Sequence, residues 1–262
     1  LRYYPTEGRF EPMLAESYES SENGLEWTFH IRQGVKFHTG NTLTALDVKA
    51  SIERTIDRGQ GISYIWDPVE RIELVDDYTV KFYLEQPVAL DLIASALTNA
   101  FIFDSQYTDE SWYADGNDSG TGPYTVTRIT GLKEVRMQKF ADYWRGWTGR
   151  EFESLIYRTV ESPTTRKLML ENGEADMTNR LVIEMLPSIE TDPRLDLVTG
   201  IVWENMVLDF NVIKPPLDNV LVRKALAYTI PYDDIIDVTL GGYGTKSRGY
   251  VMQYLWGHSD EI

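Results

Sequence analysis

The side chains that could do chemistry are few, and they form no recognisable catalytic set. The chain has three histidines, His30, His38 and His258, and no cysteine, which excludes thiolate nucleophiles, thiolate metal sites and disulfides. His30 alternates with apolar residues in a predicted strand, and His38 lies in a predicted turn. A histidine without a partner at metal-ligand or triad spacing most often has a structural role. With no Gly-x-Ser-x-Gly nucleophile elbow either, the sequence favours binding over catalysis.

Two other patterns resemble chemical sites but fit ordinary structural roles better. Asp76-Asp77 lies in a predicted hairpin turn and Asp233-Asp234 in the first turn of a predicted helix, where acidic residues are common. Residues 241–246, Gly-Gly-Tyr-Gly-Thr-Lys, resemble a phosphate-binding loop, but the spacing is wrong and the run follows a helix. We therefore predict no catalytic residue, no metal site and no cofactor.

Composition and charge indicate a folded acidic protein. A length of 262 residues allows one large or two medium domains, and a hydrophobic fraction of 42% supports a buried core. The 41 acidic and 25 basic residues give a net charge of −16, which repels phosphate backbones and argues against nucleic acid as a partner. Such a charge fits a soluble surface or attraction of cationic ligands. No apolar run approaches the roughly 20 residues that span a bilayer.

Periodicity predicts mixed helices and strands, and so an α/β architecture. Helical spacing and end signals predict helices at 44–58, 88–97, 162–172, 183–189, 218–230 and 232–240. Alternation and turn residues predict strands at 27–31, 72–75, 78–84, 124–129, 133–137, 155–160, 176–178, 195–198 and 206–210. The 16 tyrosines and seven tryptophans suit a protein that closes over a ligand, although most must serve packing.

Several segments match, in order, one known signature. They read P-M-L-A-E-S-Y at 12–18, G-L-E-W-T-F-H-I-R-Q-G-V-K-F-H-T-G at 24–40, G-T-G-P-Y at 120–124, G-E-A-D at 173–176 and P-P-L-D-N-V-L-V-R-K-A-L at 215–226. Over about residues 11 to 246 the chain thus resembles family 5 extracellular solute-binding proteins, the receptors of oligopeptide, dipeptide and nickel importers.

The resemblance implies a type II periplasmic-binding-protein-like fold in which lobe I is split into a sheet domain and an inserted accessory domain. It implies an accessory part at 1–114, a sheet domain at 115–210 and the start of lobe II at 211–262. The sequence is then expected to be an internal fragment that lacks the export signal. The resemblance further implies a monomer, periplasmic or on the cell surface and lipid-anchored in a Gram-positive host, that works with membrane permeases.

The resemblance also implies which residues contact ligand. The expected contacts are Tyr64, Trp66, Asn99, Asn179, Arg180, Trp203, Glu204 and Asn205. For Tyr64 and Trp66 the alternative is packing against Pro68, and for Arg180 it is a solvated cation. Trp144 is expected in a structural corner.

The function implied by the resemblance is capture of short peptides by hinged closure of two lobes, followed by delivery to the permease of an ATP-driven importer. Nickel chelates or oligosaccharides are alternative ligands for the same role. A ligand-sensing module of a regulator and a hydrolase are the alternatives from other classes.

Overall fold

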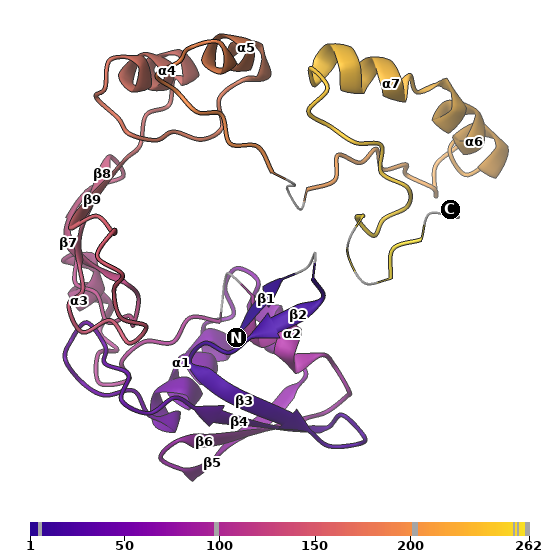
Figure 1. Cartoon of the computed structure of the whole chain (residues 1–262). Coiled ribbons are helices and arrows are strands. Elements are labelled where there is room, and N and C mark those ends of the chain that lie inside the picture. Colours follow the sequence, from indigo (N-terminus) through magenta and orange to yellow (C-terminus); the bar gives the residue numbers. More distant parts are fainter. Residues whose placement is uncertain (5–6, 97–99, 201–203, 254, 256, 260–262) are drawn as a thin grey trace. The chain divides into compact units, whose positions relative to one another are not determined.

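The chain folds into two compact units, Leu1–Thr159 and Val160–Ile262 (Figure 1). The structure is a computed structural model that describes residues 1–4, 7–96, 100–200, 204–253, 255 and 257–259. The boundary expected after residue 114 lies inside the first unit, and the one expected after residue 210 lies inside the second. The three-part division remains a prediction.

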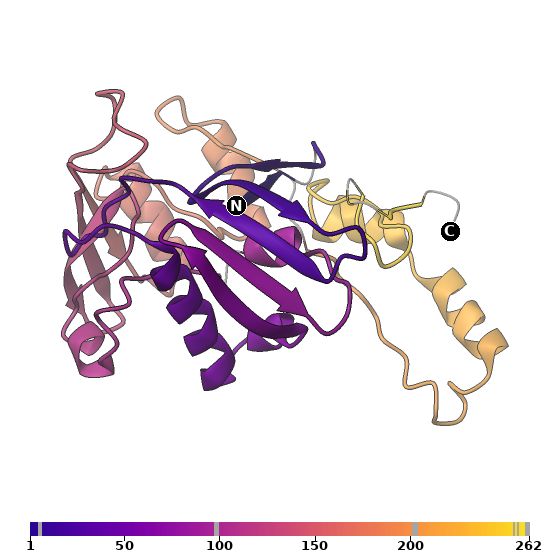
Figure 2. The same ribbon diagram turned by 90° about the horizontal axis from the view of Figure 1, so that it is seen from below.

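The first unit contains three antiparallel sheets. Its strands are β1 (Arg2–Tyr4), β2 (Arg9–Glu11), β3 (Ala15–Ser20), β4 (Glu26–Ile31), β5 (Val69–Asp76), β6 (Thr79–Leu84), β7 (Tyr124–Thr130), β8 (Glu134–Lys139) and β9 (Ser154–Arg158). Its helical elements are α1 (Ala45–Arg58), the 3₁₀ turn η1 (Ser63–Trp66), α2 (Leu90–Ala94) and α3 (Glu110–Ala114). The central sheet has the order β3-β4-β6-β5, and Figure 2 shows α1 along one face of it.

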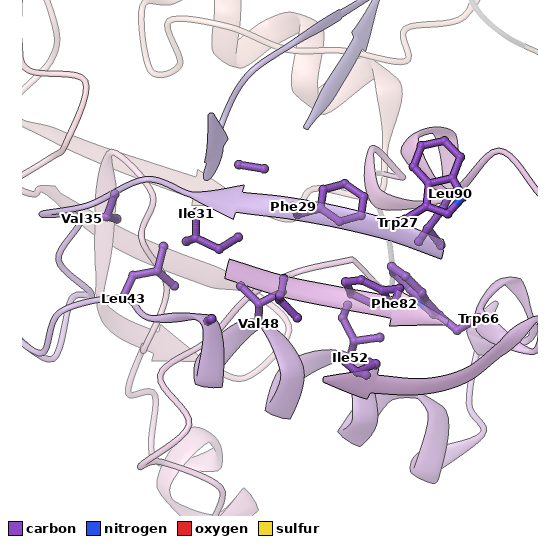
Figure 3. Packing of buried hydrophobic residues seen from close by; sticks show 14 of the residues in the cluster. Trp27, Phe29, Ile31, Val35, Leu43, Val48, Ile52, Trp66, Phe82 and Leu90 are labelled. Atoms are coloured by element: carbon purple, nitrogen blue, oxygen red, sulfur yellow. The ribbon is translucent and has the colours of Figure 1, made fainter. Parts of the chain in front are cut away.

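The alternation read from the sequence places the core between this sheet and α1. On β4, Trp27, Phe29 and Ile31 are buried, while Thr28 and His30 between them are not. Val48 and Ile52 of α1 are buried against the sheet (Figure 3). Each such side chain contributes about 1.5–3 kcal/mol when it leaves water.

Helix α1 begins and ends as its sequence predicts. The Asp47 carboxylate accepts hydrogen bonds from the Thr44 N–H at 2.8 Å and from the Thr44 hydroxyl at 2.9 Å, so the N-cap residue is tied back to the first turn. Gly59 ends the helix with a φ of 59°, a left-handed conformation that glycine adopts without strain. The helix expected at 44–58 is confirmed as α1, with Thr44 as its N-cap.

A cluster of polar contacts, which we name the His38 junction, joins His38 to residues 118–122. The two ring nitrogens of His38 lie 2.7 Å from an Asp118 carboxylate oxygen and 2.8 Å from the Gly122 carbonyl. The backbone N–H of His38 also donates a hydrogen bond to the Gly120 carbonyl at 2.8 Å. This junction ties the loop before β7 to the turn after β4. It is one physical reason why residues 115–159 belong to the first unit.

The second unit is helical in the part that the structure describes. Its elements are α4 (Pro163–Glu171), the 3₁₀ turn η2 (Ile183–Met185), α5 (Leu186–Glu190), α6 (Val220–Thr229), α7 (Tyr232–Asp234) and the π-helical turn η3 (Ile235–Thr239). The Ser162 hydroxyl accepts from the Thr165 N–H at 3.2 Å, and Pro163 follows at the first helical position. These are the start signals that the sequence showed.

The strands predicted at 176–178, 195–198 and 206–210 are wrong, because the structure has no strand at these residues. Met177, Val198 and Met206 are 87%, 91% and 88% exposed. A strand needs a neighbouring strand to pair its backbone groups, and the described residues of the second unit supply none. The apolar residues of these segments suggested strands, but a local pattern cannot show whether a second strand is present to pair with them.

Candidate functional site

The short turn η1 divides its two aromatic residues between core and solvent. Residues three apart in a 3₁₀ turn lie on the same side, and Ser63 and Trp66 are accordingly both buried. Trp66 is 2% exposed and its ring stacks against Phe82 at 6.2 Å between centroids. Tyr64, which points away from this side, is 64% exposed. Of the two predicted ligand contacts, Tyr64 presents its ring to solvent and Trp66 packs in the core against Phe82, and the contact of either ring with a ligand remains a prediction.

The segment that follows α4 carries two further predicted contacts. Helix α4 ends at Glu171, Asn172 caps it, and Gly173 follows with a φ of 72°. Asn179 and Arg180 then lie exposed in an irregular segment. Arg180 has a φ of 53°, which is left-handed and costs energy for a residue other than glycine. Such strained positions concentrate at functional sites.

The remaining predicted contacts lie close to residues that the structure does not describe. Glu204 is exposed, and the Asn205 amide donates to the Tyr250 carbonyl at 3.3 Å. Asn99 and Trp203 lie outside the described residues. The exposed candidates thus fall in two groups: Tyr64 in the first unit, and Asn179, Arg180 and Glu204 in the second. Tyr64 carries a ring, Asn179 an amide, Arg180 a guanidinium and Glu204 a carboxylate.

Arg166 is a residue that sequence analysis did not single out. Its guanidinium donates to the carbonyl of Arg180 at 2.8 Å and to the carbonyls of Val160 and Glu161. It therefore ties the segment that contains two predicted contacts to the residues before α4. The sequence carries no direct signal for this, because the three acceptors are backbone groups.

The His38 junction combines a buried histidine side chain with a carboxylate and a backbone carbonyl, both within hydrogen-bond distance. Burial lowers the pKa of His38, but hydrogen bonds to Asp118 and to the Gly122 carbonyl outweigh it, so the pKa is raised above the ordinary value. Burial conversely raises the pKa of Asp118, and its bonds to His38 and two backbone N–H groups leave it lowered. Both ring nitrogens face acceptors, which only the protonated ring can satisfy. These contacts agree with the structural role that the sequence predicts for His38.

A depression beside the turn between β5 and β6 does not include the predicted contacts. It is an open hollow of about 590 Å³, lined by Glu16, His30, Ile31, Gln33, Asp76, Asp77, Tyr78 and Thr79. Two of its three acidic residues, Asp76 and Asp77, lie at the turn between β5 and β6, where the Asp76 carboxylate accepts a hydrogen bond from the Tyr78 N–H at 2.8 Å. This is the turn role that the sequence predicts for Asp76-Asp77.

No group of three or more histidine, cysteine or carboxylate side chains in the described ranges could hold a metal ion. Among the same residues, no helix is long and apolar enough to cross a membrane.

Comparison with protein families gives a match over nearly the whole chain. The family described as bacterial extracellular solute-binding proteins, family 5 Middle, matches residues 9–262. The chain is 30% identical to the heme-binding protein A of Haemophilus influenzae over 277 residues, which cover 96% of this chain and 50% of that protein. It is also 30% identical to the glutathione-binding protein GsiB of Escherichia coli over 249 residues, covering 94% of this chain and 48% of that protein. The chain thus spans about half the length of these relatives.

Comparison with solved structures gives the same fold. The periplasmic binding protein DppA of Helicobacter pylori, solved with the peptide STSA, superposes with a TM-score of 0.72 at 27% identity. The match covers 96% of this chain and 54% of that protein. The expected type II periplasmic-binding-protein-like fold is confirmed.

Proposed function

Because this chain belongs to the bacterial extracellular solute-binding proteins of family 5, we propose that it is part of a receptor that captures short peptides for an ATP-driven importer. The observation that carries the proposal is the family match over residues 9–262. The similarity to DppA, a transporter-associated protein whose structure holds a peptide, supports a peptide as the ligand.

The residue types of the candidate contacts suit a short peptide. A peptide carries an ammonium group, a carboxylate and backbone amides, and it often carries apolar side chains. A carboxylate such as Glu204 pairs with an ammonium, and the guanidinium of Arg180 pairs with a carboxylate through charge-assisted hydrogen bonds. Asn179 can both donate to and accept from a peptide backbone. Tyr64 offers an exposed ring that adds contact area at low entropic cost.

The proposed mechanism is hinged closure of two lobes around the peptide. Closure excludes water, and polar contacts that are weak in water then become strong. In this mechanism Trp66 holds η1 in the core, so that the Tyr64 ring is presented on a rigid support. Asn99, Trp203 and Asn205 remain proposed contacts on the resemblance alone.

The same proposal includes the cellular location and the partners of the receptor. The receptor is exported to the periplasm or the cell surface, with a lipid anchor in a Gram-positive host, and acts as a monomer. It delivers the peptide to permease subunits in the membrane, performs no chemistry on it and does not bind nucleic acid. Family members are extracellular solute-binding proteins, which supports this location.

Calorimetric titration of the full-length protein tests the proposal. The ligands are a tetrapeptide, Ser-Thr-Ser-Ala, a mixed tetrapeptide library, heme, glutathione, a nickel–histidine chelate and an oligosaccharide. Binding of tetrapeptides in preference to the other ligands supports a peptide receptor. Binding of one other ligand alone would keep the receptor role and reassign its substrate, and hydrolysis of the peptides would point to an enzyme.

A matched pair of tyrosine variants tests the predicted site. Tyr64→Ala should weaken tetrapeptide binding by about 1–3 kcal/mol, the loss typical of an aromatic anchor at a binding surface. Tyr157 of β9 is the control, since its ring is 62% exposed against 64% for Tyr64. Tyr157→Ala should leave affinity unchanged. Equal affinities of the two variants would remove Tyr64 from the site.

A further inference from the structure

A single arginine links the residues that precede α4 to the segment that follows the helix. The Nη1 group of Arg166 donates to the carbonyls of Val160 at 2.6 Å and Glu161 at 2.9 Å. Its Nη2 group donates to the carbonyl of Arg180 at 2.8 Å. We call Arg166 and these three carbonyls the Arg166 clamp.

The chain contains a second arginine with the same local contacts. Arg223 lies four residues after the N-cap Asn219, as Arg166 lies four residues after the N-cap Ser162. Its Nη1 group donates to the carbonyls of Leu217 at 2.7 Å and Asp218 at 3.0 Å, the same backward steps of six and five residues. Among the described residues only Arg166 adds a third carbonyl. That third contact therefore serves something beyond the start of a helix.

The third carbonyl belongs to the strained residue of this segment. Arg180 has a φ of 53°, and a non-glycine residue keeps such a conformation only where its surroundings hold it. A charged donor on the Arg180 carbonyl supplies one such restraint. The side chains of Asn179 and Arg180 are exposed. The clamp thus fixes the backbone while it leaves both side chains free for contacts.

The guanidinium is held by its two terminal nitrogens alone. Its Nε is buried and has no hydrogen-bond partner, the one such side-chain atom among the described residues. An unpaired buried donor is unfavourable, so the fork geometry that reaches three carbonyls outweighs this penalty. A lysine has no Nε donor to leave unpaired, but its single ammonium cannot reproduce the planar fork.

We propose that Arg166 is a positioning residue for the ligand, which holds the backbone at Arg180 so that Asn179 and Arg180 present their side chains in the binding geometry. The inference rests on the proposed function, in which these two residues contact the peptide. Arg166 acts through backbone carbonyls and does not touch the ligand.

The test compares Arg166→Lys with Arg223→Lys in the full-length protein, with Ser-Thr-Ser-Ala and the tetrapeptide library as probes. Both variants lose the fork at a helix start, so the thermal stability of each should fall, and Arg166→Lys should fall at least as far because it also loses the third carbonyl. Only Arg166→Lys should weaken peptide binding, by about threefold to thirtyfold, the range of residues that act through a neighbour. Hydrogen exchange at the amides of residues 179–181 should accelerate in Arg166→Lys and stay unchanged in Arg223→Lys.

A double-variant cycle with Asn179→Ala separates positioning from general loosening. If Arg166 acts through this segment, Arg166→Lys should weaken binding less in the Asn179→Ala background than in the wild type. Additive losses would overturn the inference, as would equal losses of affinity in Arg166→Lys and Arg223→Lys. Faster exchange at 179–181 with unchanged affinity would also overturn it and leave the peptide receptor intact. A wild-type protein that binds no tetrapeptide would instead overturn the proposed function, and the inference with it.

Discussion

Tyr64 and Trp66 are separated by one residue, yet the structure gives them opposite surroundings. The 3₁₀ turn buries Ser63 and Trp66 on one side and leaves Tyr64 on the other. The resemblance to known receptors identified the segment, but it treated both rings alike. Which ring faces solvent depends on the register of the turn against Phe82, and that register depends on contacts distant in sequence.

Trp66→Ala should lower the free energy of unfolding by about 3–5 kcal/mol, because the deleted ring leaves a cavity against Phe82. Tyr64→Ala should change it by less than about 0.5 kcal/mol, as expected for an exposed side chain. Urea unfolding of both variants provides the measurement. A Trp66→Ala variant as stable as Tyr64→Ala would show that the ring does not support η1 from the core.

The His38 junction gives stability a pH dependence with two limbs. The pKa of His38 is raised above 6.5, so its contribution is fully present below about pH 6.5 and is lost as pH rises through the folded-state pKa. The pKa of Asp118 is lowered below 3.8, so its contribution is present above about pH 3.8 and is lost as pH falls through the folded-state pKa. The junction is therefore strongest between these limits.

Thermal unfolding of the wild type and His38→Gln at pH 5.5 and pH 8.5 checks the upper limb. The wild type should lose more of its melting temperature between the two pH values than the variant, which has no imidazole to deprotonate. Parallel losses in both proteins would mean that other groups set the pH dependence of the fold.

At the scale of elements, α1 is fastened to the chain by its first turn as well as by its apolar face. The Asp47 side chain is 5% exposed. One of its oxygens accepts from Thr44 and the other from the N–H and hydroxyl of Ser105 at 3.0 Å and 2.7 Å. A residue that sequence analysis assigns to a helix cap thus also holds the segment at Ser105, which is 58 positions away.

Asp47→Asn should destabilise the protein by about 2–4 kcal/mol. The substitution replaces one carboxylate oxygen, an acceptor, with an NH2 group, which faces donors that it cannot satisfy. Asp57→Asn is the matched control on the same helix, since Asp57 is exposed, and it should stay within about 0.5 kcal/mol of the wild type. Chemical denaturation measures both. Equal stabilities would mean that solvent satisfies the donors of Thr44 and Ser105.

Helices and strands were predictable from the sequence where the signal lies within the segment itself. The strand with Trp27, Phe29 and Ile31, the hairpin at Asp76-Asp77 and the helix that begins after Ser162 all follow from local alternation, turn residues or caps. The strand predicted at 206–210 failed because pairing depends on a second segment, which the local pattern cannot show. For the same reason the role of Arg166 could not be predicted from the sequence, since its acceptors are backbone carbonyls of three other residues.

At the scale of the whole molecule, the buried hydrophobic residues are distributed unequally. In the described part of the chain, every buried hydrophobic side chain except Ile189 belongs to the first unit. The family and the fold could be predicted from signature segments in both units, because these are local strings of residues. The division of the chain after Thr159 could not be predicted from the sequence. It depends on contacts between distant segments, such as those of the His38 junction and of the sheets.

The His38 junction also has a consequence for the order in which the first unit folds. Its partners are 80 positions apart, so forming it early would close a long loop at a high entropic cost. The hairpins β3–β4 and β5–β6 join near neighbours in sequence, and such local contacts form sooner. We therefore expect the junction to be absent from the folding transition state. Asp118→Ala should then speed unfolding about tenfold for each 1.4 kcal/mol of lost stability and leave the folding rate unchanged in stopped-flow experiments. A slower folding rate would instead place the junction in the folding nucleus. With the expected result, the junction slows unfolding and does not direct folding.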